Sequence, residues 1–123
     1  MERNAGNCGE VEKYMIQESI RMSIPPQKSE AILGILRAVL ERSQDDPCCL
    51  GCHIYGDLNE KNVLMLEGLW STEEGLEHHL RSDEYRNLLL ALELAVRRPE
   101  IRFNTISGST GIETIEKARG QAR

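Results

Sequence analysis

The residues best suited to chemistry stand together in "DPCCLGCHIYGD", residues 46–57, which holds Cys48, Cys49, Cys52 and then a histidine. Cysteine and histidine are the side chains that most often bind transition metals, and cysteine also exchanges disulfides. Residues 49–52 have the C-x-x-C spacing that is found in sites of both kinds. Three interpretations follow: a metal knuckle, a redox-active pair, or an ordinary strand that carries buried thiols.

The spacing favours the third interpretation, although metal binding and redox use stay open as alternatives. A structural zinc site needs a second pair of ligands, and the nearest pair, His78 and His79, occupies adjacent helical positions that point in different directions. In an extended strand, Cys49 and Cys52 are roughly 10 Å apart on opposite faces, whereas a disulfide allows a Cα separation of only about 7 Å. A bend at Gly51 would bring them closer. We predict buried strand thiols, no bound metal and no disulfide between Cys49 and Cys52.

Two residues are candidates for catalytic proton transfer, Glu18 and His79. Glu18 interrupts an apolar strand, so its carboxylate either pairs with Arg21 or Arg102, which we favour, or lies in a cavity that raises its pKa. His79 lies three residues after Leu76 on a predicted helix, which turns its ring inward. A structural histidine at such a position is the more frequent case, and a catalytic histidine is the alternative.

Four further residues are candidates for substrate binding: Trp70, Tyr85, Arg102 and Asn104. Trp70 ends a predicted strand, and His79 lies about two turns into the helix that follows. We therefore expect Trp70 to border the main internal pocket and His79 to reach it or its mouth. A lone tryptophan is as often a large core residue, and each of the other three has a structural role as its alternative.

Hydrophobic periodicity predicts four strands and two helical segments in the order β-α-β-β-α-β. The strands are expected at residues 14–22, 49–56, 62–70 and 100–107, and the helical segments at 27–44 and 71–96. A capping box at Ser71 starts the second segment, and Ser82 offers a second cap within it. Two crossovers and a hairpin predict an α+β fold, a ferredoxin-like sandwich with both helical segments on one face of an antiparallel sheet.

The face of the sheet that the helices do not cover also carries apolar residues, which must be buried. The third strand is apolar on both faces, with Val63, Met65 and Leu69 on one and Leu64, Leu66 and Trp70 on the other. A sheet with one solvated face normally alternates polar and apolar residues. We therefore predict a homodimer that buries this face. The chain divides into a flexible lead at residues 1–13, the domain at 14–107, and a tail or arm at 108–123.

Composition excludes several classes of partner. The net charge of −5 disfavours a nucleic-acid backbone or an anionic membrane, and a single phenylalanine leaves no stacking platform for RNA. No apolar run approaches the ~20 residues that span a bilayer. The first residues lack the apolar core of a secretory signal. We expect a cytoplasmic protein with reduced thiols.

Four stretches resemble the antibiotic biosynthesis monooxygenase (ABM) family, a group of dimeric ferredoxin-like α/β barrels. They are "IRMSIPP", "DPCCLGCHIYGD", "LWSTEEGLEHHLRSDEYRNLL" and "RRPEIRFNTIS", and the resemblance runs from Met15 to Ile115. The chain departs from the family pattern at Cys48, where glycine is usual, and at Gly68, where many members carry glutamate. The axial histidine of haem-degrading relatives falls at Leu89.

The resemblance implies a cofactor-independent monooxygenase that acts on a small aromatic or quinol-like metabolite. In that case Trp70 shapes the pocket, and His79 or Glu18 handles the proton. Whether the protein is an enzyme stays open at this point. An isomerase-type enzyme of the same fold is one alternative, and a non-catalytic dimeric binding or stress module is the other.

Overall fold

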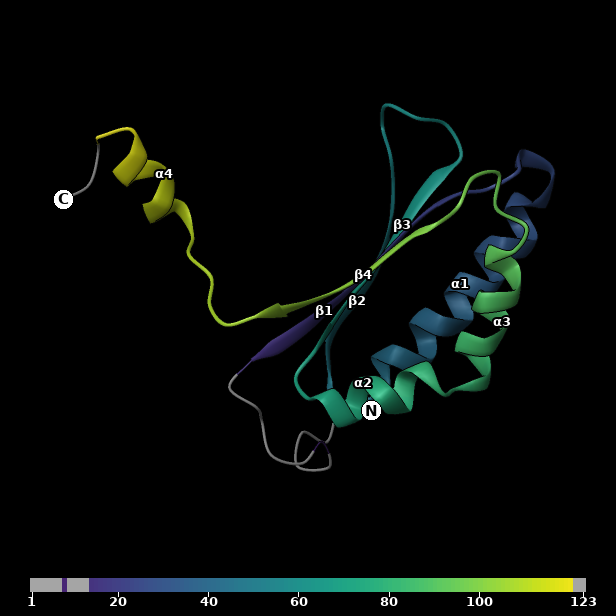
Figure 1. The fold of residues 1–123 in the computed structure, drawn as a ribbon, viewed down its shortest axis with the longest axis horizontal. Helices are drawn as coiled ribbons and strands as arrows, with labels where there is room; N and C mark the ends of the chain where they lie inside the picture. Colours follow the sequence, from purple (N-terminus) through teal and green to yellow (C-terminus); the bar gives the residue numbers. More distant parts are fainter. Residues whose placement is uncertain (1–7, 9–13, 121–123) are drawn as a thin grey trace.

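The computed structural model describes Cys8 and residues 14–120, which form a four-stranded sheet with helices packed on one face (Figure 1). The elements in chain order are β1 (Met15–Ser23), the short 3-10 helix η2 (Pro26–Lys28), α1 (Ser29–Gln44), β2 (Cys49–Gly56), β3 (Val63–Trp70), α2 (Glu73–Leu80), α3 (Asp83–Leu92), β4 (Glu100–Ile106) and α4 (Ile112–Ala118).

The strands lie in the order β2-β3-β1-β4, and every neighbouring pair is antiparallel. The hairpin joins β2 to β3, and helical crossovers lead into β2 and into β4. α1, α2 and α3 lie on one side of the sheet (Figure 1). The predicted ferredoxin-like α+β fold is thus confirmed, with a second predicted helical segment that is divided into α2 and α3.

The core lies between these helices and the inner face of the sheet. Alternate residues of β1 are buried, ending with Ile20 and Met22, as the twofold repeat of a strand requires. Leu36 of α1, Leu66 of β3 and Leu88 of α3 are each fully buried against them. Complete burial of an aliphatic side chain of this size contributes about 1.5–3 kcal/mol, so this cluster holds α1 and α3 against the sheet.

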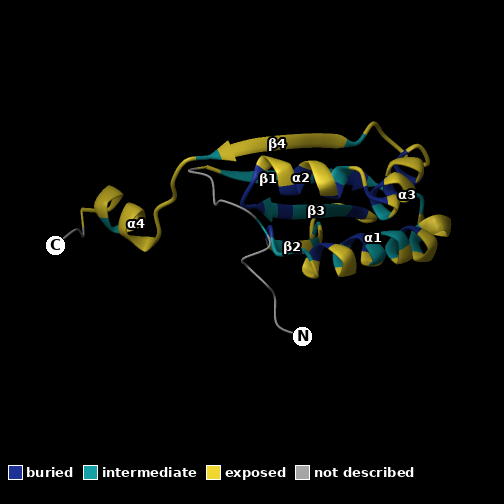
Figure 2. Cartoon of the chain, turned by 90° about the horizontal axis from the view of Figure 1, so that it is seen from below, coloured by how far each residue is buried: buried dark blue, intermediate teal, exposed yellow. Residues whose placement is uncertain are grey.

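The sheet edge at β4 is uncovered in the single chain. Residues 100–105 are exposed and Ile106 is half-buried, and β4 appears as a yellow arrow beside the helical layer (Figure 2). Ile101 and Phe103 remain 43% and 45% exposed. α4 projects away from the domain (Figures 1 and 2), with Ile112 and Ile115 exposed. The tail predicted at residues 108–123 therefore contains a short helix; residues 121–123 lie outside the described residues, as does most of the lead at 1–13.

Of the two predicted helix caps, one differs from the structure and one is confirmed. The N-cap of α2 is Thr72, whose hydroxyl accepts a hydrogen bond from the Gly75 amide at 3.0 Å. Ser71 lies one residue before the cap, and its hydroxyl donates to the carbonyl oxygen of Cys48, 3.2 Å away. The cap at Ser82 is confirmed by its 3.1 Å hydrogen bond from the Tyr85 amide.

The cysteines of β2 are arranged differently from an ideal strand. Cys49 and Cys52 are both buried thiols in β2, as predicted. A β-bulge between Cys49 and Gly51 adds one residue to the strand, so Cys49 pairs with Trp70 and Cys52 pairs with Gly68. Because Trp70 and Gly68 share a face, the two cysteines also share a face, and the expectation of opposite faces is wrong.

The expectation that all thiols are reduced is wrong as well. Cys48 forms a disulfide with Cys8, across a sequence separation of 40 residues. Cys48 precedes β2 and is only 6% exposed. Gly75, in the first turn of α2, packs directly against its side chain.

This contact predicts that residue 75 must be glycine. A Cβ atom there would lie 2.8 Å from Cys48 Sγ and closer still to Cys48 Cβ. We expect Gly75→Ala to lower the free energy of unfolding by about 1–3 kcal/mol. Gly34→Ala is the matched control, since a Cβ at residue 34 of α1 has no atom within 4 Å. That change should stabilise the helix by about 0.5–1 kcal/mol. Equal effects in urea denaturation would contradict the contact.

Candidate active site

A buried carboxylate and a buried imidazole meet between α2 and the sheet. Glu18 comes from the inward-facing set of β1, and His79 comes from the inner face of α2, three residues after Leu76. Glu18 Oε1 lies 2.9 Å from His79 Nε2, and the two side chains are 0% and 2% exposed. Because a carboxylate oxygen can only accept, Nε2 is the donor of this hydrogen bond. We call these two residues the Glu18–His79 pair.

The side chain of Glu18 does not make the expected ion pair with an arginine. Arg21 lies at an odd number of residues from Glu18 along β1, so the two point to opposite faces. The Arg21 guanidinium pairs instead with Asp57 and Glu60, at 2.9 and 2.8 Å. Arg102 also lies on the outer face, opposite Ser19 in the register. The predicted partners are therefore wrong, and the imidazole takes their place.

Two aromatic rings hold the imidazole of His79. The ring of Trp70, at the end of β3, stacks on it with centroids 4.4 Å apart and planes 29° apart. The ring of Tyr85, in the first turn of α3, meets it edge-on at 4.9 Å and 72°. Trp70 and Tyr85 are 0% and 4% exposed. The imidazole is therefore fixed in orientation and shielded from water.

The neighbouring acidic groups remain protonated at neutral pH. Burial, together with the adjacent Glu18 carboxylate, raises the pKa of the Tyr85 phenol well above its usual value. Burial is also the main cause that raises the pKa of the Cys52 thiol to about 12, with a smaller contribution from Cys49. Both groups are therefore protonated and neutral near the carboxylate, and neither is a nucleophile.

Ser43 of α1 completes the cluster, and sequence reasoning missed it. Its hydroxyl donates to the carbonyl oxygen of Val39 at 2.8 Å and lies 3.5 Å from His79 Nδ1. The available signal was its position, because Ser43 follows Leu36 and Val39 at helical spacing on the buried face of α1. A polar residue that continues a buried stripe indicates a polar partner in the core.

Two polar atoms of this cluster have no hydrogen-bond partner among the described residues, Glu18 Oε2 and Trp70 Nε1. One is an acceptor and the other a donor, so both are available to a bound molecule. Gly68 keeps space beside the indole nitrogen and the bonded carboxylate oxygen, Oε1, since it lies opposite Glu18 in the register. A Cβ at residue 68 would be 3.0 Å from Trp70 Nε1 and 3.1 Å from Glu18 Oε1.

The other two predicted binding residues lie elsewhere. Arg102 and Asn104 of β4 pair with Ser19 and Gln17, so both are on the outer face of the sheet. Asn104 Nδ2 donates to Gln17 Oε1 at 3.3 Å. The structure thus brings together Glu18, His79, Trp70 and Tyr85, and it leaves Arg102 and Asn104 apart from them.

The expected position of the main pocket is also wrong. The larger cavity, of about 620 Å³, is lined by residues between the end of α1 and α2, among them Arg42, Cys48 and His78. Neither Trp70 nor His79 lines it, because α2 turns His79 inward and its neighbour His78 outward. A second cavity of about 340 Å³ is lined by Arg21 and Glu60, among others.

Over Cys8 and residues 14–120, there is no cluster of three or more histidine, cysteine, aspartate or glutamate side chains that would hold a metal ion. Among the same residues, no helix has the length and apolar character needed to cross a membrane.

The Glu18–His79 pair predicts a non-additive effect on stability. His79→Leu leaves a buried carboxylate without its partner, and Glu18→Leu leaves a buried N–H, so each should cost about 3–5 kcal/mol of unfolding free energy. The double variant removes both groups and should cost clearly less than the sum. His78→Leu is the control, because the side chain of His78 is 70% exposed. Additive losses in urea denaturation would refute the pairing.

Comparisons with known proteins agree with this fold. The antibiotic biosynthesis monooxygenase family model matches residues 15–89. A conserved protein from Methanosarcina mazei Go1 is 20% identical, with a TM-score of 0.68 over 75% of this chain and 92% of that one. A Pseudomonas aeruginosa protein is 16% identical, with a TM-score of 0.66 over 83% and 100%.

A third structure, that of an antibiotic biosynthesis monooxygenase, is 14% identical, with a TM-score of 0.66 over 78% of this chain and 99% of that one. At these identities the structures establish the shared fold alone. No curated protein matches the chain. The family model covers more than half of the sequence, from the first strand through most of α3. The chain therefore belongs to the antibiotic biosynthesis monooxygenase family.

Proposed function

We propose that the protein is a cofactor-independent monooxygenase that acts on a small aromatic or quinol-like metabolite. Family membership supports the reaction class. The observation that carries the proposal is the buried Glu18–His79 pair, whose carboxylate has a second oxygen, Oε2, without a hydrogen-bond partner among the described residues. A buried, oriented carboxylate and imidazole are groups that can accept a proton in a site from which water is excluded.

In the proposed reaction, Glu18 Oε2 accepts the proton of a phenol or quinol while His79 holds the other carboxylate oxygen. The resulting anion donates an electron to dioxygen, so that no metal or organic cofactor is required. Trp70 supplies an aromatic surface and a free indole N–H for the substrate oxygen. Tyr85 stays protonated and does not compete for the proton. Substrate entry requires the rings of Trp70 and Tyr85 to move, since both are buried.

Two other functions are supported by particular observations. An isomerase-type reaction needs only the proton transfer and would use the same carboxylate and imidazole without dioxygen. A non-catalytic binding or stress module is favoured by the closed packing around His79 and by the position of the larger cavity, which neither His79 nor Trp70 lines. Oxygen consumption distinguishes the proposed monooxygenase from both the isomerase and the binding module.

We expect metal-free protein to consume oxygen with at least one member of a panel of quinols and polyphenols, measured with an oxygen electrode. His79→Ala should lower the rate by ~10²-fold or more because it removes a positioned acid–base group. His78→Ala, a change at an exposed neighbour, should leave the rate unchanged. Circular dichroism would verify that both variants are folded. Rearranged products without oxygen uptake would instead indicate the isomerase, and binding without turnover the binding module.

We also propose that the protein is a homodimer in which a second copy covers the outer face of the sheet. Val63, Met65 and Leu69 of β3 face that side, and they are buried or half-buried even in the single chain. Gly51 and Gln17 flank Leu69 in the register and offer no bulky cover. Apolar residues on an outer sheet face favour association with another sheet. We also propose that this dimer is a cytoplasmic protein.

Light scattering at micromolar concentration should therefore give twice the chain mass. We expect the interface of this dimer to bury more than about 1,200 Å² in total. Leu69→Asp should shift the protein toward monomer because it places a carboxylate in that interface. Leu58→Asp is the matched control, since Leu58 lies in the hairpin turn and is fully exposed. A monomeric wild-type protein, or equal dissociation by both variants, would contradict this arrangement.

A further inference from the structure

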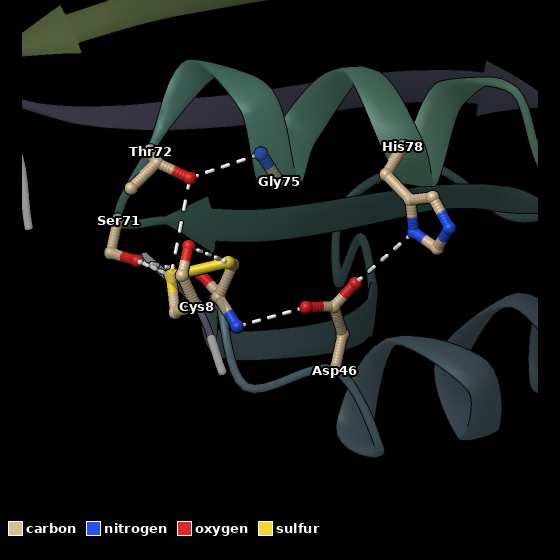
Figure 3. Close-up of a disulfide and its surroundings, with 7 residues drawn as sticks. Cys8, Asp46, Ser71, Thr72, Gly75 and His78 are labelled. Carbon is tan, nitrogen blue, oxygen red and sulfur yellow. Dashed lines mark hydrogen bonds and ion pairs between the residues drawn. A yellow bond between two sulfur atoms is a disulfide. The ribbon is translucent and has the colours of Figure 1, made fainter. Parts of the chain in front are cut away.

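The disulfide between Cys8 and Cys48 lies where α2 begins (Figure 3). The carbonyl oxygen of Cys48 accepts hydrogen bonds from the Ser71 amide at 2.9 Å and the Ser71 hydroxyl at 3.2 Å. Cys8 Sγ lies 3.1 Å from the same hydroxyl and 4.0 Å from that of Thr72, the cap of α2. The disulfide thus fastens Cys8 to the turn before β2, beside the residues that lead into the helix that carries His79.

Both cysteines line the cavity of about 620 Å³ that the Glu18–His79 pair does not reach. The cavity opens to solvent beside α2, where the side chains of His78 and Arg81 are 70% and 78% exposed. Cys48 is only 6% exposed, whereas Cys8 is half-buried. A small molecule in the cavity therefore meets the disulfide, and Cys8 is the more exposed residue of the two.

The walls of this cavity carry charges of both signs. The cationic side chains are Arg42, His78 and Arg81, and the anionic ones are Asp45, Asp46, Glu74 and Glu77. Several of them already face each other at the long distances of weak surface ion pairs, 3.4 Å for Arg81 with Glu77 and 3.8 Å for His78 with Asp46. A ligand that bears carboxylates and an ammonium group can replace these contacts at little cost.

We propose that this cavity binds a zwitterionic, peptide-like thiol of low molecular weight, of the chemical class of glutathione, and that Cys8–Cys48 is the disulfide with which it exchanges. The site is separate from the Glu18–His79 pair and does not depend on the function proposed for that pair.

The exchange begins when the thiolate of the ligand attacks Cys8 Sγ. A bond forms between the two sulfurs, the Cys8–Cys48 bond breaks, and its electron pair leaves on Cys48 as a thiolate, which takes a proton from water. A second ligand thiol then attacks the mixed disulfide, releasing Cys8 as a thiol and the ligand as its own disulfide. Two electrons pass from two thiols to the protein disulfide.

The surroundings of Cys48 suit a leaving group. Its sulfur lies against Gly75 in the first turn of α2, where the positive end of the helix dipole favours a thiolate and the carboxylates of Glu74 and Asp46 oppose it. Once protonated, the thiol has an acceptor in the carbonyl oxygen of Cys8, which lies 3.2 Å from Cys48 Sγ. The exchange would release Cys8 from its contact with Thr72, the cap of α2. The contacts at the start of this helix would then depend on the concentration of the thiol ligand.

The test compares two thiols on the oxidised full-length protein. Reduced glutathione and 2-mercaptoethanol are added in parallel, the reaction is quenched with acid, and the cysteine peptides are analysed by mass spectrometry. Cys48→Ser, treated with glutathione disulfide, should carry glutathione on Cys8. Cys52 should remain unmodified in the folded protein because its raised pKa keeps it a buried, protonated thiol.

Recognition by the charged walls is tested with Arg42→Gln/Arg81→Gln. This double variant should slow reduction by glutathione about three- to ten-fold, the effect of losing two partly exposed charge contacts, and should leave the rate with 2-mercaptoethanol unchanged. The matched control is Arg37→Gln/Arg86→Gln, at two arginines that do not line the cavity. Equal slowing with both thiols would overturn the binding site. A disulfide that glutathione reduces only in urea would overturn the exchange as well.

Discussion

The rest of the site depends on one contact, the hydrogen bond from His79 Nε2 to Glu18 Oε1 at 2.9 Å. A carboxylate with no solvent exposure carries a large desolvation penalty unless a partner compensates it. Here the partner comes from a different element, so α2 must lie directly over β1. This position of α2 limits the path of the short connection from the end of β3. It also places the imidazole against the ring of Trp70, the last residue of β3.

The same constraint explains a departure from the family pattern. Many members of the family carry glutamate two residues before the tryptophan, and this chain has Gly68 there. Gly68 lies opposite Glu18 in the register, and a side chain at residue 68 would meet both Glu18 and Trp70. In this chain the carboxylate is that of Glu18 on β1, the strand next to β3, and Gly68 leaves room for it. Placed on β1, the carboxylate reaches α2.

Periodicity predicted the elements, because each depends on spacing within one segment. The alternation of β1, the stripe of α1 and the hairpin all appear close to their expected bounds. The partner of Glu18 was beyond this reasoning, since a pairing between β1 and α2 depends on how two distant segments pack. Arg21 was close in sequence but on the wrong face. The bulge in β2 was missed for a related reason: one inserted residue reverses the facing of the residues after it. Cys8 lies in a polar lead without periodicity, so nothing in its sequence neighbourhood indicated Cys48.

The most direct test of the central contact is NMR spectroscopy of the imidazole nitrogens with ¹⁵N-labelled protein, with His78 as the internal reference. If the Glu18–His79 pair exists in solution, His79 Nε2 carries a proton that exchanges slowly with water, and Glu18→Gln shifts its resonance while the resonances of His78 stay in place. The exposed His78 should show no such protected proton. A His79 ring proton that exchanges as fast as that of His78, or a resonance that Glu18→Gln does not move, would contradict this account of the site.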